Sequence, residues 1–148
     1  MTPVFPGLRA RLRNCRGILV DSNVLLDIAA QDSTWSNWSE RALAECAGFA
    51  ELFINPIIYA EVSVSYSTIE ALELSLPRDI YRREPLPWEA GFLAGKCFQL
   101  YRKRKGTRTN LMPDFYIGAH ATVARLALLT RDAAFNRTYF PQLEVLCP

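Results

Sequence analysis

The sequence predicts a three-layer α/β fold in which a mostly parallel central sheet is flanked by helices. Two stretches carry this prediction: the apolar residues 18–20 run directly into Asp21, and the apolar residues 126–129 run into Thr130-Arg131-Asp132. Continuous apolar runs of this length are typical of strands buried on both faces of a parallel sheet. Because open parallel sheets bind ligands beyond the carboxyl ends of their strands, we expect Asp21 and Asp132 to meet in one crevice.

The elements between these two strands alternate between helical and strand patterns, which is typical of right-handed parallel crossovers. Asn55-Pro56 joins a capping residue to a proline at the first helical position, so a helix is expected directly after a short buried strand. An amphipathic stripe predicts another helix over 88–101. In chain order we expect strands at 18–20, 52–54, 126–130 and 143–146, and helices at 35–49, 56–66, 68–76, 88–101, 113–125 and, briefly, from 132.

Length and composition indicate one domain: the chain has 148 residues, of which 50% are hydrophobic and 22% charged. Polar residues and a proline interrupt the richest apolar stretch, so no membrane span of roughly 18 residues is expected. The cysteines are scattered and form no Cys-x-x-Cys motif, so we interpret them as reduced thiols of a cytoplasmic protein. They are Cys15, Cys46, Cys97 and Cys147.

The net charge of +2 conceals two clusters of basic residues that contain no acid. The first lies in residues 1–16, which we interpret as a basic N-terminal arm in preference to a transit peptide, with the domain proper at 17–148. A charge cluster is usually a solvated surface, but two beside a carboxylate crevice favour a polyanionic ligand. The clusters comprise Arg9, Arg11, Arg13 and Arg16, and Arg102, Lys103, Arg104, Lys105 and Arg108.

Four acids are candidates for the crevice, and each has a structural alternative. Asp21 follows a buried strand but could instead cap the next helix. Glu61 lies on a largely apolar helix face, where a salt bridge or a bound cation would compensate its charge. Asp114 is in the first turn of its helix, where acids favour the helix dipole. Asp132 is also in a first turn, with Thr130 as a plausible cap.

The neighbours of these acids refine the prediction. Small residues on the Asp114 face, at Gly118 and Ala121, would let this helix approach the sheet closely. Asn23 could hold Asp21 in place or bind a water molecule. Asp27 is expected at the surface or in a turn, beyond the edge of the crevice.

Four carboxylates in one place repel one another by about 1 kcal/mol per close pair in water and by more at a lower effective dielectric. Hard cations with oxygen ligands relieve this repulsion, and magnesium or manganese is the usual occupant. Such a site can activate water for attack at phosphorus, so the pattern favours phosphodiester hydrolysis. A histidine-based catalytic triad or a zinc site is not expected, because His120 is the only histidine. Its apolar neighbours indicate a buried structural role.

Four segments resemble the motifs of PIN-domain ribonucleases, in the right order and spacing. They are 19–27 (Leu-Val-Asp-Ser-Asn-Val-Leu-Leu-Asp), 55–62 (Asn-Pro-Ile-Ile-Tyr-Ala-Glu-Val), 111–121 around Pro113-Asp114, and 129–132 (Leu-Thr-Arg-Asp). The ending, residues 139–145, is similar to that of VapC toxins of type II toxin–antitoxin modules. Two departures are that Ser22 stands where Thr is more usual, and that the arm before Gly17 is longer than the minimal domain requires.

The resemblance implies a PIN fold with Asp21, Glu61, Asp114 and Asp132 around one or two magnesium or manganese ions, assisted by the Thr130 hydroxyl. It implies a metal-dependent endoribonuclease with an RNA substrate, a small VapB-like antitoxin that blocks the site, and a homodimer. The 102–108 segment, and with it the N-terminal arginines, would then contact the RNA backbone.

Two rival functions remain at this point. Residues 18–21 also resemble the nucleophile strand of haloacid-dehalogenase-like phosphatases, but that chemistry needs an aspartate two residues later, where this chain has Asn23. The other rival is a PIN-like module that holds RNA or a protein without cutting it. The presence of all four acids argues against this second rival.

Overall fold

The computed structural model describes residues 2–148, and within them five strands form one all-parallel sheet in the order β3-β2-β1-β4-β5. The strands are β1 (Gly17–Val20), β2 (Leu52–Ile54), β3 (Tyr81–Arg83), β4 (Leu126–Leu129) and β5 (Val145–Leu146). The helices are α1 (Leu8–Arg11), α2 (Ser22–Ala29), α3 (Ser36–Ala47), α4 (Pro56–Ser63), α5 (Ile69–Ser75), α6 (Trp88–Lys103), α7 (Met112–Val123) and α8 (Ala133–Tyr139). The predicted fold class is confirmed.

The two strands that carried the prediction are neighbours at the centre of the sheet. β1 and β4 pair in parallel from Gly17 opposite Leu126 to Val20 opposite Leu129, and every residue of both strands is buried. Each strand has a helix layer on either face, which explains its continuous apolar sequence. Because the strands are parallel and in register, Asp21 and Thr130 leave the sheet side by side.

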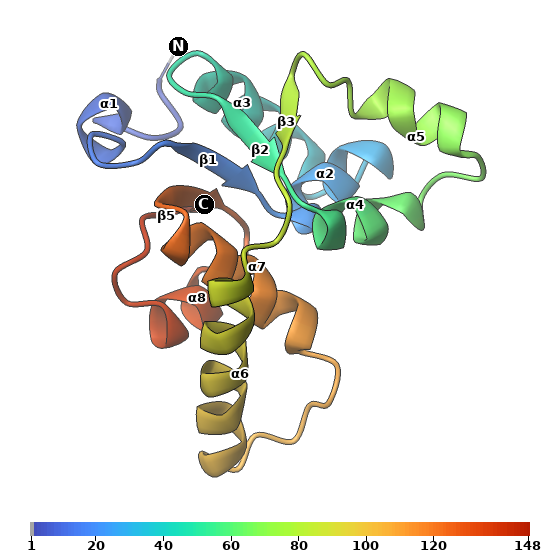
Figure 1. The fold of residues 1–148 in the computed structure, drawn as a ribbon. Helices are drawn as coiled ribbons and strands as arrows, with labels where there is room; N and C mark the ends of the chain where they lie inside the picture. Colours follow the sequence, from blue (N-terminus) through green and yellow to red (C-terminus); the bar gives the residue numbers. More distant parts are fainter. Residues whose placement is uncertain (1) are drawn as a thin grey trace.

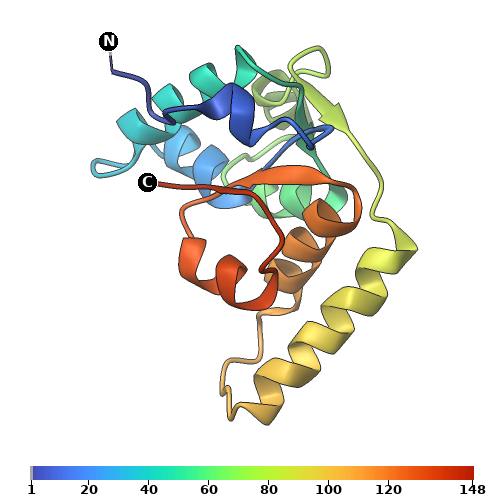
Figure 2. The same ribbon diagram turned by 90° about the vertical axis from the view of Figure 1, so that its left-hand side faces the viewer.

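The helices divide into two layers around the sheet (Figures 1 and 2). α2 and α3 lie on one side, and α6, α7 and α8 lie together on the other. The main hydrophobic core joins the strands to α2, α3, α4 and the buried side of α7. A second cluster, which includes Ala94, Cys97 and Phe115, packs α6 against α7 and α8 and so fixes the helix that carries Asp114.

Some elements differ from those that the pattern predicts. β3 was not predicted, because its sequence Tyr-Arg-Arg has no apolar run. It is an edge strand, paired only with β2, and its cations Arg82 and Arg83 bind Glu51 and Glu73. An edge strand is solvated along one side, so it needs no continuous apolar sequence.

Other boundaries moved by a few residues. α2 follows Asp21 at once and was not predicted as a helix of its own. α6 continues to Lys103, two residues beyond its predicted end at 101. α4 ends at Ser63, three residues before its predicted end at 66. β5 is two residues long where four were expected.

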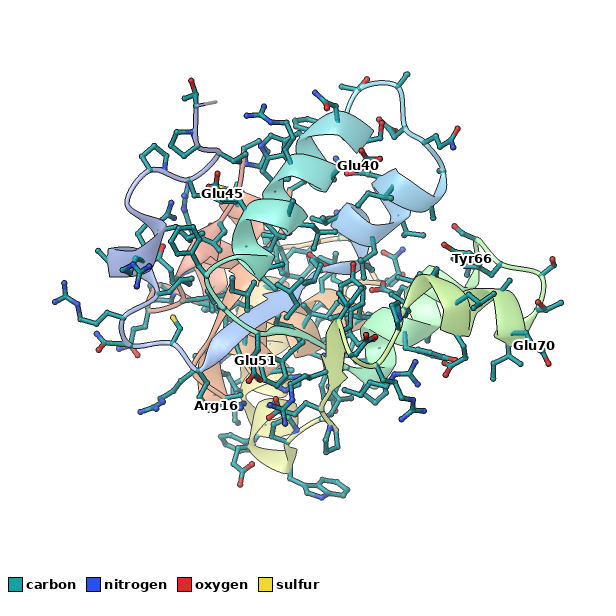
Figure 3. The ribbon with its side chains drawn as sticks, turned by 90° about the horizontal axis from the view of Figure 1, so that it is seen from above. Arg16, Glu40, Glu45, Glu51, Tyr66 and Glu70 are labelled. Carbon is teal, nitrogen blue, oxygen red and sulfur yellow. The ribbon has the colours of Figure 1, made fainter. Side chains whose placement is uncertain are left out.

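The N-terminal residues pack against the domain. Phe5, Leu8 and Leu12 are buried in the main core. The Glu45 carboxylate accepts hydrogen bonds from the backbone nitrogens of Val4 and Phe5, at 2.8 and 2.6 Å. Figure 3 shows Glu45 on α3 and Arg16 just before β1. A boundary between an arm and a domain at residue 17 stays a prediction.

Two of the four N-terminal arginines are engaged in structural ion pairs. Arg11 binds Glu144 at 2.9 Å, and Arg16 binds Glu84 at 2.8 Å. Arg16 directly precedes β1, whereas Asp21 directly follows it, so this cluster lies toward the amino ends of the strands. Contact of the N-terminal arginines with an RNA backbone stays a prediction, although two of them already have acidic partners.

All four cysteines are free thiols, two of them buried. Over residues 2–148, no helix has the length and apolarity needed to cross a bilayer.

We expect Leu8→Ala to lower the free energy of unfolding by about 2–3 kcal/mol, because Leu8 is only 3% exposed in the core. Urea unfolding measures this loss, with the exposed Arg9→Ala on the same helix as control. Equal stability of both variants would show that residues 2–16 are a loosely attached arm.

Candidate metal centre

Asp21 lies at the carboxyl end of β1 and is 7% exposed. It occupies the position that precedes α2, but its side chain accepts no capping hydrogen bond from the first turn. The Thr130 hydroxyl, at the end of β4, instead donates to Asp21 Oδ2 at 2.7 Å. The carboxylate is therefore held toward β4, and the capping alternative is wrong.

Thr130 and Asn23 connect the ends of β1 and β4. Thr130 Oγ1 also accepts from the backbone nitrogen of Asp132 at 3.0 Å and from Asn23 Nδ2 at 3.2 Å. Asn23 Oδ1 accepts from the backbone nitrogen of Arg131 at 3.2 Å. These bonds fix the turn after β4 against the start of α2, so Asn23 holds the neighbourhood of Asp21 in place.

Glu61 comes from α4 and joins the site through α2. Ser22 Oγ donates to Glu61 Oε1 at 2.8 Å and lies 3.4 Å from Asp21 Oδ1. Glu61 is half-buried, and its helix face is less apolar than expected, because Val64 is 80% exposed beyond the end of α4. Within residues 2–148 Glu61 forms no ion pair, so a salt bridge does not explain this carboxylate.

Asp114 lies in the first turn of α7, directly after Pro113 and directly before the fully buried Phe115. Of the two small residues on its face, Ala121 is fully buried in the core that contains the strands, as α7 packs against β4. Gly118 approaches α8 instead, since a Cβ atom there would meet the Phe140 ring at 2.2 Å and Asn136 at 2.9 Å. The start of α7 therefore lies close enough to Asp132 for the two acids to interact.

Asp132 is the most exposed of the four acids. It is itself the N-cap of α8, and its Oδ1 accepts from the backbone nitrogen of Phe135 at 3.3 Å. Thr130 was the expected cap; it bonds the backbone of Asp132 instead. One oxygen of Asp132 is thus engaged in the cap, and the other has no hydrogen-bond partner within residues 2–148.

The charges of these acids act on one another. Burial raises the pKa of Asp21 to about 6, against a lowering by the Thr130 hydrogen bond, and the charges of Asp114 and Glu61 raise it further. Burial also raises the pKa of Asp114 to about 6; Glu61 and Asp132 add to this rise, and Arg108 opposes it. Each acid is therefore coupled to at least one other.

The donor set fits a hard divalent cation, since it offers carboxylate oxygens that repel one another without a counter-charge. The side chains are spread more widely than a bound ion requires. Within residues 2–148, no three acidic, histidine or cysteine side chains lie close enough together to chelate one ion. An ion would have to draw the flexible Glu61 and the Asp132 carboxylate inward.

Asp27 and Arg131 form a supporting pair that the sequence did not indicate. Asp27 was expected at the surface or in a turn, but it is 4% exposed. Its carboxylate accepts hydrogen bonds from Nε and Nη2 of Arg131, at 2.7 and 2.9 Å. Ser39 Oγ donates to the same carboxylate at 2.7 Å, and the Arg131 guanidinium lies over the Trp35 ring. The sequence signal that could have predicted this burial is that Asp27 lies three residues after Val24, on the same buried face of α2.

His120 has the buried structural position that was predicted. It is fully buried in α7, and its Nδ1 lies 3.0 Å from Asn55 Nδ2 at the end of β2. Asn55 Oδ1 caps α4 by accepting from the Ile58 backbone nitrogen at 2.9 Å. Burial lowers the pKa of His120, which favours the neutral ring. The pair thus links α7 to the start of the helix that carries Glu61.

The second basic cluster extends from the far end of α6 into the following loop. Arg102 and Lys103 lie in the last turn of α6, and Arg104, Lys105 and Arg108 follow it. All five are exposed. Figure 1 shows this loop returning from the end of α6 to the start of α7, where Asp114 lies.

The fold is that of an α/β protein whose candidate acids follow two neighbouring parallel strands or lie on the helices α4 and α7. The PIN domain family model matches residues 18–141. The chain therefore belongs to the PIN domain family. No curated protein sequence matches it significantly.

Several solved structures share the fold at low sequence identity. One is VapBC2 from Rickettsia felis bound to a DNA fragment from its promoter, with a TM-score of 0.66 at 16% identity over 86% of this chain and 96% of that one. Another is VapBC-1 from nontypeable Haemophilus influenzae, with 0.63 at 17% identity over 88% and 96%. FitAcB from Neisseria gonorrhoeae gives 0.60 at 18% identity over 87% and 96%.

The raised pKa of Asp21 predicts a pH-dependent stability of the metal-free protein. A carboxyl group with a folded pKa near 6 and an ordinary value of 3.8 binds its proton more tightly in the native state. Its contribution to stability is therefore present at low pH and is lost as the pH rises through 6. We expect Asp21→Asn, which resembles the protonated form, to raise the free energy of unfolding at pH 7.5 by on the order of 1 kcal/mol.

Urea unfolding in EDTA at pH 7.5 and at pH 5 measures this effect. The stabilisation should shrink at pH 5, because the parent carboxyl is then largely protonated. A variant that is less stable than the parent at both values would contradict the prediction.

The Asp27–Arg131 pair should contribute to stability. Asp27→Ala leaves the largely buried Arg131 guanidinium without its bidentate partner, so we expect a loss on the order of 2 kcal/mol. Urea unfolding measures the loss, with the exposed, unpaired Asp79→Ala as control. A loss no greater than that of the control would show that the pair contributes nothing.

Proposed function

We propose that this protein is a metal-dependent endoribonuclease that hydrolyses RNA phosphodiester bonds. The observation that carries the proposal is the position of Asp21 at the carboxyl end of β1, where Thr130 holds its carboxylate and Ser22 joins it to Glu61. Membership of the PIN domain family supports it, since PIN domains are generally nucleases. The chemistry of a hard-oxygen donor set supports Mg²⁺ or Mn²⁺ as the cofactor.

In this proposal Asp21, Asp114 and Asp132 hold the metal, and Glu61 is a further ligand or orients the attacking water. The bound ion supplies a counter-charge and lowers the pKa of a water molecule at phosphorus. Thr130 and Asn23 keep Asp21 aimed into the crevice, and Ser22 holds Glu61 beside it. Because Asp21 is nearly buried, its side chain keeps almost the same orientation in this proposal when the metal binds.

The exposed basic cluster from Arg102 to Arg108 supplies contacts to the RNA backbone in this proposal. Such contacts position a nucleic acid without selecting its sequence. The members are Arg102, Lys103, Arg104, Lys105 and Arg108.

We further propose that the enzyme is the toxin of a toxin–antitoxin pair and acts in the cytoplasm. The shared fold with chains of the VapBC and FitAB complexes supports a VapB-like antitoxin as its partner. A homodimer is part of the same proposal. Co-expression with the product of a short adjacent gene tests the partner, which should co-purify with the protein and inhibit it.

A non-catalytic PIN-like module is the competing function, and no feature of the site favours it. The phosphatase alternative is not favoured, because the chain belongs to the PIN family. Asn23, which stands where a phosphatase needs an aspartate, forms hydrogen bonds with Thr130 and with the backbone of Arg131.

Purified protein should cleave RNA when Mg²⁺ or Mn²⁺ is added and should be inactive in EDTA. We expect Asp21→Asn and Asp114→Asn each to lower the cleavage rate by at least about 100-fold, since each removes a charge from the metal site. Gel analysis of a labelled RNA measures the rate. Asp79→Asn, an exposed acid on another loop, is the matched control and should retain full activity.

Two outcomes would contradict the proposal. Cleavage that persists in both active-site variants would contradict the assignment of the site. RNA binding without cleavage at any metal concentration would favour the non-catalytic module.

A further inference from the structure

The loop between α6 and α7 is fixed by one side chain, Tyr101, in the last turns of α6. Its hydroxyl oxygen accepts a hydrogen bond from the backbone nitrogen of Arg108 at 3.0 Å. Its backbone carbonyl accepts from the backbone nitrogen of Gly106 at 3.0 Å. One residue thus holds the loop at two points, Gly106 and Arg108, the second of which is seven residues after Tyr101.

The same ring also sets the path of the loop between these points. A Cβ atom at Gly106 would lie 2.3 to 2.5 Å from three atoms of the Tyr101 ring, so only glycine lets the backbone cross the ring face. Lys105, just before it, has a φ of 64°, a left-handed conformation that lysine adopts at some cost. Such a conformation persists only where the surrounding contacts require it.

Tyr101 is itself anchored beside the metal-site helix. Its ring packs against Phe115, the residue after Asp114, with 6.0 Å between centroids, and against Tyr139 at 6.3 Å. Phe115 is fully buried. The aromatic cluster that positions Asp114 therefore also positions the loop.

The basic residues of this segment do not occupy equivalent places. Arg102 lies over the Phe98 ring and Arg104 over the Tyr139 ring, so aromatic faces hold both of these guanidinium groups. Arg108 lies where the loop returns to α7, four residues before that helix begins at Met112, and its charge acts on Asp114 in the first turn. It forms no ion pair within residues 2–148, so it is available to a ligand.

We infer that Tyr101 is a positioning residue that holds Arg108 at the rim of the carboxylate crevice, where Arg108 binds the scissile phosphate. This inference deepens the proposed function and rests on it. Arg108 provides a cation whose charge reaches Asp114, and its planar guanidinium suits a bidentate contact with a phosphate. Gly106 serves the same purpose through its contact with the ring.

A double-mutant cycle tests the inference. We expect Arg108→Ala to lower kcat/KM for RNA cleavage by about tenfold or more, mainly through kcat, because the cation faces charge that develops in the transition state. Arg104→Ala, a matched removal of one charge, should mainly raise KM and reduce the salt dependence. Tyr101→Phe removes only the hydroxyl and should lower kcat/KM about threefold.

The cycle separates positioning from a purely structural role. In the Arg108→Ala background the backbone hydrogen bond to Tyr101 remains, so Tyr101→Phe should change the melting temperature as it does in the parent. It should no longer change kcat/KM, because the side chain that it positions is gone. An equal loss of activity in both backgrounds, or full activity of Arg108→Ala, would overturn the inference.

The failure of this inference is distinguishable from failure of the proposed function. If the parent protein does not cleave RNA, the proposed function fails. The phosphate contact is then tested by binding of a labelled single-stranded RNA in EDTA, where Arg108→Ala should weaken binding more than Arg104→Ala does. Equal weakening by the two variants would overturn the special role of Arg108.

Discussion

The parallel pairing of β1 with β4 is the constraint on which the site depends. It brings Asp21 and Thr130 out of the sheet as neighbours, although one is near the start of the chain and the other near its end. The hydrogen bond from Thr130 Oγ1 to Asp21 Oδ2 then fixes the carboxylate, and Asn23 extends the connection to the turn that carries Asp132. A slip in register of these two strands would separate every one of these groups.

The second constraint is electrostatic. Asp21 and Asp114 have raised pKa values because burial and neighbouring acids disfavour their charged forms. The native fold holds like charges together at a cost in stability, and this is a common property of functional sites. The hydrophobic packing of Phe115 and the Asp27–Arg131 pair hold the helices and turns in place against this repulsion.

Residue types alone did not reveal which charges belong to the site. Asp27 looked like a surface residue, but it is a buried partner of Arg131, because the first turns of α2 lie against the turn after β4. The N-terminal arginines formed one basic cluster in the sequence, yet Arg11 and Arg16 bind Glu144 and Glu84. Pairing of this kind is long-range, so no local pattern signals it.

The sequence by itself determined the parallel α/β fold, the two central strands and the four candidate acids, because buried strands need continuous apolar runs and their carboxyl ends share one edge. It did not determine the edge strand β3, whose solvated side permits a polar sequence. Only the tertiary structure decided that Thr130 bonds Asp21, that Asp132 caps its own helix and that Tyr101 fixes the loop of Arg108. The bond of Thr130 to Asp21 joins segments that are far apart in the chain and meet only because the whole domain packs. The contacts of Asp132 and Tyr101 are with residues three and seven positions away, and they depend on the exact backbone path of a turn and a loop.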